Sequence, residues 1–131
     1  MPSELTTKIP AEWVGLANRA IEVRKLAYAP YSHFLVGCAL EDSRGNVFTG
    51  CNVENASYSL SVCAERVAVA KMVTEGGSEI RRVALITSSD LVCFPCGSCR
   101  QVLSEFGAPE VFSMNLKGSE FEVLGLNLLL P

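Results

Sequence analysis

The sequence lacks any segment that would direct a chain into or across a membrane. No window of about 18 apolar residues runs free of charge, so no transmembrane helix is predicted. The first ten residues carry Glu4 and Lys8, and no apolar run follows Met1, so no signal peptide is readable. We therefore expect a cytoplasmic protein without membrane contact, whose cysteines stay reduced.

Positive charge and histidine are also scarce. The 131 residues hold 11 Lys and Arg against 14 Asp and Glu, for a net charge of -3. Proteins that bind nucleic acid polymers use clustered Lys and Arg to neutralise phosphates, so this class of function is disfavoured. The single histidine, His33, is expected to be a solvated loop side chain without a role in a site.

Apolar residues and cysteines, by contrast, are plentiful. Apolar residues make up 49% of the chain, enough for one domain to bury a core without disulfides or lipid. In a reducing compartment, clustered thiols indicate metal binding or catalysis rather than disulfides. We expect three further cysteines, Cys38, Cys51 and Cys93, to be buried small hydrophobic residues.

Hydrophobic periodicity predicts helices that alternate with strands after a first hairpin. Residues 1–10 are predicted to be a flexible segment, and residues 11–131 a single domain. The predicted helices span 11–27, 62–75 and 99–106, and in the second of them Val62, Val69, Met72 and Val73 are expected to face inward. The predicted strands span 35–40, 47–49, 82–87, 111–114 and 121–123, with a polar extended loop at 52–61 and a short C-terminal turn at 127–130. This order predicts an α/β fold with three layers, α/β/α, in which helices cover both faces of a mixed sheet of about five strands.

The strongest chemical feature is a pair of short segments, Cys63-Ala64-Glu65-Arg66 and Pro95-Cys96-Gly97-Ser98-Cys99-Arg100. The C-x-x-C spacing lets two thiolates reach one ion, and thiolate ligands suit zinc. Cys63 and Cys99 each open a predicted helix, where the partial positive charge of the helix start favours thiolate. Three sulfurs could thus converge, and three protein ligands would leave the fourth tetrahedral position to water, as in catalytic zinc sites.

Two charged residues beside the cysteines fit that interpretation. Zinc with three thiolates carries a formal charge of about -1, which weakens the acidity that the metal imposes on its water. We hypothesise that Arg66 offsets this charge by donating to a thiolate sulfur. Glu65, close to Cys63 in sequence, could take the proton of the water and later give it to a leaving group.

Other interpretations of the thiols remain open at this point. A dithiol redox motif is one of them. An iron–sulfur cluster is another, although the run from Cys93 to Cys99 lacks the C-x-x-x-C-P continuation of the bacterial pattern. A non-catalytic, zinc-stabilised binding module would need a fourth protein ligand, for which Cys93 is the candidate, and would leave Glu65 unexplained.

The same two segments resemble the zinc nucleoside and nucleobase deaminases, whose pattern is His or Cys-x-Glu followed by Pro-Cys-x-x-Cys. The resemblance covers roughly residues 11–130, and it is specific for cytidine deaminases in the segments 29–34, 48–58 and 99–102. Because Cys stands at position 63 and the chain is short, it resembles the homotetrameric branch of the family rather than the dimeric branch.

The resemblance implies a reaction and a cofactor. The reaction is the hydrolytic deamination of cytidine and 2′-deoxycytidine to uridine and deoxyuridine, with release of ammonia, in pyrimidine salvage. One Zn²⁺ per chain would be bound by Cys63, Cys96 and Cys99. Glu65 would be the proton shuttle, and Arg66 matches the arginine that compensates charge in the family.

The resemblance also implies how a nucleoside is held. Phe34 would stack against the pyrimidine, and the backbone N–H of Ala64 would bind the base carbonyl. Asn52 and Glu54 would hold the ribose, and their spacing in an extended segment puts both side chains on one side. A related aminopyrimidine nucleoside such as blasticidin S is an alternative substrate, but the segment 52–55 favours an ordinary ribonucleoside.

Partner subunits are implied by the resemblance alone. In the homotetrameric branch, Ala56 and Tyr58 would reach into the site of a neighbouring subunit. Family members usually continue beyond the position of Pro131 with a Phe that closes a neighbour's site, and the sequence given ends without it.

Overall fold

The computed structural model describes residues 9–87 and 90–129. Most of the predicted flexible segment, and the last residue of the predicted C-terminal turn, lie outside these ranges. Ile9 is described and is 5% exposed, and it belongs to the same hydrophobic cluster as Trp13. The N-terminal end of the described chain is therefore anchored on the domain core.

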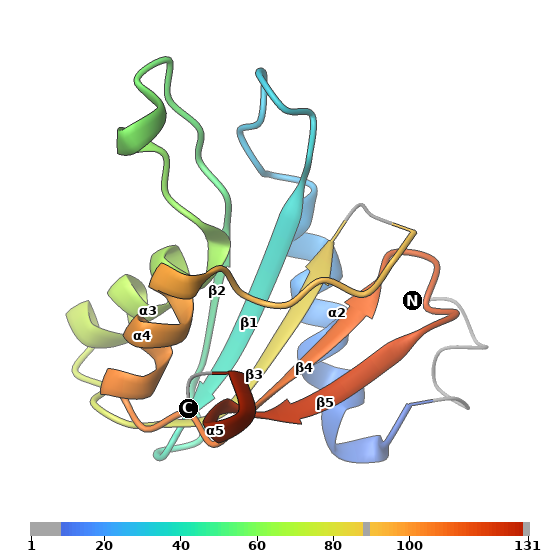
Figure 1. Cartoon of the computed structure of the whole chain (residues 1–131). Coiled ribbons are helices and arrows are strands. Elements are labelled where there is room, and N and C mark those ends of the chain that lie inside the picture. Colours follow the sequence, from blue (N-terminus) through green and yellow to red (C-terminus); the bar gives the residue numbers. More distant parts are fainter. Residues whose placement is uncertain (1–8, 88–89, 130–131) are drawn as a thin grey trace.

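Five strands form one mixed sheet, as predicted, and the structure gives their order as β2-β1-β3-β4-β5 (Figure 1). β3 and β4 are parallel, and the other neighbouring pairs are antiparallel. The strand bounds are β1 Val36–Asp42, β2 Val47–Cys51, β3 Ile80–Thr87, β4 Glu110–Asn115 and β5 Phe121–Gly125.

Helices cover both faces of this sheet, so the predicted three-layer α/β/α fold is confirmed (Figure 1). Leu85 on β3 packs in the cluster that contains Val69 and Leu103 of the helices on one face. Ile86, its neighbour along the strand, packs with Trp13 on the other face. The helices are α2 Ala11–Arg24, α3 Ala64–Thr74, α4 Gly97–Glu105, α5 Leu126–Leu129 and the 3₁₀ turn η1 Tyr58–Leu60.

Within the ranges 9–87 and 90–129, no helix has the length and apolar character that crossing a membrane requires.

Several local predictions were wrong in their details: the second and third helices, predicted over 62–75 and 99–106, span Ala64–Thr74 and Gly97–Glu105. The first helix ends at Arg24 rather than at residue 27, because the N–H groups of residues 25–27 donate to carbonyls three residues back instead of four. The loop 52–61 contains the 3₁₀ turn η1. Val73 is 45% exposed rather than inward, whereas Val69 and Met72 on the same helix are buried as predicted.

The other cysteines also differ from one another. Cys38 is fully buried, as predicted, whereas Cys51 and Cys93 are only half-buried. Both of these residues lie where the chain leaves regular packing, Cys51 at the end of β2 and Cys93 in the loop before α4.

A glycine lets α3 approach the sheet closely. A Cβ built on Gly50 of β2 would fall on the carbonyl oxygen of Ala64 and lie 2.6 Å from the amide nitrogen of Ala68. Only glycine permits this contact, and the contact places the first turn of α3 directly over the end of β2. The position of that first turn matters because it carries Cys63 and Glu65.

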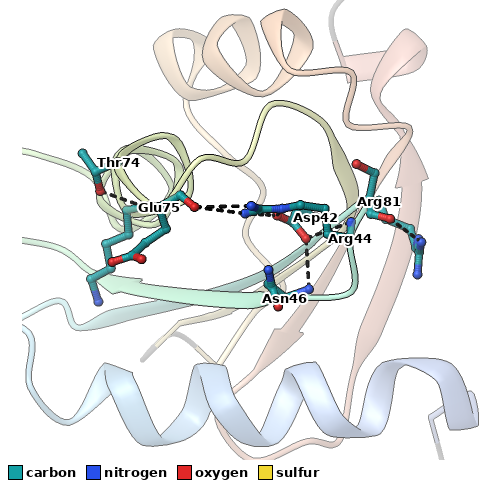
Figure 2. A network of polar contacts seen from close by, with 8 residues as sticks. Asp42, Arg44, Asn46, Thr74, Glu75 and Arg81 are labelled. Atoms are coloured by element: carbon teal, nitrogen blue, oxygen red, sulfur yellow. Dashed lines mark hydrogen bonds and ion pairs between the residues drawn. The ribbon is translucent and has the colours of Figure 1, made fainter.

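A polar network fixes the C-terminal end of β1, where the chain turns into β2 (Figure 2). The buried carboxylate of Asp42 accepts hydrogen bonds from Arg44 Nε at 2.8 Å and from the backbone N–H of Asn46 at 2.9 Å. Arg44 also donates to the carbonyl of Glu75, and Arg81 donates to that of Ser43. The β1–β2 turn is thereby tied to the end of α3 and the start of β3.

Candidate functional site

Three cysteine sulfurs from two helix starts meet at one edge of the domain. Cys63 is the N-cap residue of α3, and Cys96 is the N-cap residue of α4, with Cys99 in the first turn. Their sulfurs lie within 4.8 Å of one another, and Cys63 Sγ is 3.9 Å from Cys96 Sγ. The convergence predicted from the two helix starts is confirmed, although Cys96 rather than Cys99 immediately precedes α4.

The sulfur geometry fits a zinc ion. Zn–S bonds of about 2.3 Å in a tetrahedron separate the sulfurs by about 3.8 Å, close to the observed Cys63–Cys96 distance. Cys99 is buried and Cys96 is exposed, so the cluster is open on one side. Among the described residues Cys93 is not part of this group, and its sulfur instead contacts the carbonyl of Leu91 at 3.7 Å. The three sulfurs can hold one zinc ion and leave a fourth position without a Cys93 ligand.

The surroundings of Cys63 favour its thiolate, whereas those of Cys99 favour its thiol. The hydrogen bond from Cys99, joined by those from Arg66 and Cys96, lowers the pKa of Cys63 to about 5. The same pairing with Cys63, with burial, raises the pKa of Cys99. Arg66 also donates from Nη2 to the carbonyl of Ser61 at 3.3 Å, which holds the guanidinium beside the cluster.

Glu65 lies in the first turn of α3, beside the sulfurs, and is 4% exposed. Burial raises the pKa of this carboxyl to about 7, and negative charge on Cys63 acts in the same direction. A carboxyl with such a pKa can take up and release a proton near neutral pH, which suits a general acid and base.

A cavity of about 590 Å³ opens next to Glu65 and the cluster. This volume is in the range of small-molecule sites. Most of the predicted site residues line it, namely Phe34, Asn52, Glu54, Tyr58, Cys63, Ala64, Glu65, Arg66 and Cys96. Cys99 is buried behind the lining, and the exposed Ala56 lies outside it.

Asn52 braces the loop that carries Phe34. Its Oδ1 accepts a hydrogen bond from the backbone N–H of Val36 at 2.8 Å, and its Nδ2 donates to the carbonyl of Phe34 at 2.8 Å. Phe34 is 38% exposed and faces the cavity instead of the core.

Glu54 also binds the loop that carries Phe34. Its Oε1 accepts hydrogen bonds from the backbone N–H groups of Tyr31 and Ser32, at 3.0 and 3.1 Å, and its Oε2 accepts one from the Ser32 hydroxyl. The Ser32 hydroxyl and these N–H groups hold the pKa of Glu54 below its ordinary value, so the carboxylate is ionised.

Sequence reasoning missed Ser32 and Thr87. Ser32 belongs to a turn that begins at Pro30, and nothing local pairs it with Glu54. Thr87 is a polar residue at the carboxyl end of a predicted buried strand, a position at which ligand sites are common in α/β sheets. It is 2% exposed and lines the cavity, and among residues 9–87 and 90–129 its hydroxyl has no hydrogen-bond partner.

Comparisons with known proteins agree with this arrangement. Residues 14–115 match the family model for the cytidine and deoxycytidylate deaminase zinc-binding region. The cytidine deaminase of Sporosarcina psychrophila is 42% identical over 110 residues, which are 82% of this chain and 81% of that protein. The solved cytidine deaminase of Burkholderia pseudomallei has a TM-score of 0.84 at 42% identity, covering 89% of this chain and 94% of that one. For the Mycobacterium tuberculosis cytidine deaminase the TM-score is 0.79 at 38% identity, with 92% and 94% covered. Similarity of this extent, in sequence and in fold, shows that the chain belongs to the cytidine and deoxycytidylate deaminase family.

Proposed function

We propose that this protein hydrolyses cytidine and 2′-deoxycytidine to uridine and deoxyuridine, with release of ammonia, and binds one zinc ion per chain through Cys63, Cys96 and Cys99. The observation that carries the proposal is the buried Glu65 beside three converging sulfurs, on the wall of a cavity large enough for a nucleoside. Its family relatives that are named cytidine deaminases support it.

The chemistry follows from the position of Glu65. A zinc ion at the three sulfurs supplies Lewis-acid activation of a water molecule. Glu65 would take one proton from that water and give it to ring nitrogen N3 of the pyrimidine, and it would then pass the second proton, from the new hydroxyl on C4, to the leaving amino group. The water oxygen bonds to C4 and the bond from C4 to the amino nitrogen breaks, so cytidine and water yield uridine and ammonia.

The cavity walls provide contacts for both halves of a nucleoside. Phe34 presents a ring face for stacking on the pyrimidine. Ala64 is the first residue of α3, where backbone N–H groups have no partner within the helix and can bind the base carbonyl. Asn52 and Glu54 hold the ribose, and the negative charge of Glu54 disfavours a phosphate there, so nucleosides are preferred to nucleotides.

We further propose a cytoplasmic homotetramer that acts in pyrimidine salvage. The loop with η1 extends away from the sheet (Figure 1), and it exposes Tyr58 at 91% and Leu60 at 64%. Large apolar side chains gathered on an exposed loop are typical of an interaction surface. In the tetramer, Ala56 and Tyr58 of one subunit contact the site of its neighbour.

The deciding experiment follows the ultraviolet absorbance of cytidine with the purified, zinc-loaded protein. We expect a steady conversion to uridine in the wild type, its loss in Glu65→Gln with zinc still bound, and its retention in Glu105→Gln, which alters an exposed carboxylate on α4. No conversion by zinc-loaded wild type would refute the proposal. Turnover of blasticidin S alone would reassign the substrate, and four metal-protected thiols per zinc would indicate a binding module.

A further inference from the structure

The turn from Ala29 to Phe34 contains a strained residue at its centre. His33 has a φ of 59°, and its N–H donates to the carbonyl of Ala29 at 3.0 Å. This left-handed conformation is uncommon for residues other than glycine and costs free energy, so neighbouring contacts must hold it. Phe34, the next residue, is the side chain that this turn places on the cavity wall.

Ser32 connects this turn to Glu54. The backbone N–H of Phe34 donates to Ser32 Oγ at 3.0 Å, and the Ser32 hydroxyl in turn donates to Glu54 Oε2. Two further hydrogen bonds, from the N–H groups of Tyr31 and Ser32, end on Glu54 Oε1. Every one of these bonds restrains the backbone on the N-terminal side of Phe34.

The hydrogen bonds from Phe34 through Ser32 to Glu54 form a relay. The charge of its last member sets the strength of the hydrogen bonds that end there. Glu54 is ionised, and hydrogen bonds to a carboxylate are stronger than those between neutral groups. Ser32 is exposed, so its hydroxyl has water as an alternative partner and no packing reason for its orientation. Its use as both acceptor and donor therefore points to a positional role at the site rather than to a role in the core.

We propose that Ser32 and His33 are positioning residues, which fix the Phe34 ring for stacking on the pyrimidine of the substrate. Ser32 transmits the anchoring of Glu54 to the Phe34 backbone, and His33 provides the left-handed turn that aims Phe34 at the cavity. This inference rests on the proposed deaminase function. Stacking acts on the bound substrate and on the transition state alike, so its loss raises KM and leaves kcat nearly unchanged.

The test uses two matched pairs of variants in the zinc-loaded protein. Ser32→Ala removes the relay, and Ser32→Thr keeps a hydroxyl. His33→Val disfavours the left-handed conformation, and His33→Asn tolerates it. We expect KM for cytidine to rise about tenfold in Ser32→Ala and in His33→Val, with kcat within about twofold of wild type. Ser32→Thr, His33→Asn and the distant control Ser78→Ala should keep the wild-type KM.

Two results would overturn the inference: an unchanged KM in Ser32→Ala, or an equal rise in Ser32→Thr. Amide hydrogen exchange of residues 29–35 without substrate tests the restraint independently of turnover. Faster exchange in Ser32→Ala than in wild type supports the relay, and equal exchange contradicts it. If wild type fails to deaminate cytidine, the proposed function fails, and the exchange comparison still decides whether the relay exists.

Discussion

Cys63 Sγ and Cys96 Sγ lie 3.9 Å apart, although 33 residues separate them along the chain. The packing of α3 against α4 brings the two helix starts together, and Leu103 of α4 shares a hydrophobic cluster with Met72 of α3. The metal site therefore depends on two helix positions and on the charge around them, and each of these can be tested.

Replacing Arg66 with Gln should weaken zinc binding. The guanidinium beside Cys63 helps to lower the pKa of that thiol, so its loss leaves more uncompensated negative charge on the thiolates. Changes to such supporting contacts typically cost about 10- to 100-fold in metal affinity. Competition with a chromophoric chelator measures this affinity. Lys71→Gln, at an exposed position on the same helix, is the control, and equal zinc retention in both variants would argue against the role of Arg66.

Replacing Asn52 with Ala should raise KM for cytidine about tenfold without loss of zinc. The substitution removes the two side-chain hydrogen bonds from Asn52 to the backbone of Phe34 and Val36, together with the proposed ribose contact. Steady-state kinetics measures the change in KM, and metal analysis of the same preparation checks that zinc is retained. Asn127→Ala on the exposed side of α5 should behave as wild type, and an unchanged KM in Asn52→Ala would exclude the bracing role.

Replacing Gly50 with Ala should destabilise the fold by about 1–3 kcal/mol, because the added methyl group overlaps the backbone of α3. The displaced first turn of α3 should also lower kcat/KM. Gly15→Ala is the contrasting variant, since nothing lies within 4 Å of a Cβ there. Because position 15 is exposed, that change should stabilise α2 by about 0.5–1 kcal/mol. Urea unfolding measures both, and a Gly50→Ala protein as stable as wild type would contradict the close packing.

Replacing Asp42 with Asn should lower the urea midpoint at neutral pH and reduce the sensitivity of stability to acid. Burial opposes ionisation of Asp42, but the hydrogen bonds from Arg44 and Asn46 outweigh it and lower the pKa of the carboxyl. A lowered pKa contributes stability that is fully present above the unfolded-state value, about 3.9, and is lost as the pH falls through the folded value.

The measurement for this prediction compares unfolding of Asp42→Asn and wild type at pH 7 and at pH 3–4. The difference in the free energy of unfolding between the two proteins should be large at pH 7 and smaller in acid. Zinc release in acid affects both proteins alike and cancels in the comparison. Asp90→Asn alters an exposed carboxylate paired with Lys117, and it should show little effect at either pH. A difference that stays constant across the pH range would mean that the charge of Asp42 does not contribute to stability.

Local sequence was enough to predict most of the elements and the chemistry of the metal ligands. The period of apolar residues predicted the order of helices and strands, because side chains facing the core repeat with the geometry of each element. The spacing of Cys96 and Cys99 predicted a shared ion, since one turn separates them. Details that depend on tertiary contacts were not predicted: the chain after α2 leaves the helix to bond through Tyr28 to Asn52, and Val73 lies on the outer side of α3.

The sequence by itself determined the residue types available for catalysis and the secondary structure that carries them. Only the tertiary structure decided which of them meet. Cys63 joins Cys96 and Cys99 because α3 and α4 pack on the same face of the sheet. Ser32 joins Glu54 because the bridge between Tyr28 and Val53 aligns two loops that are far apart in sequence. Such contacts produce no periodic pattern in the sequence, because each depends on how whole elements pack rather than on residues that are neighbours in the chain.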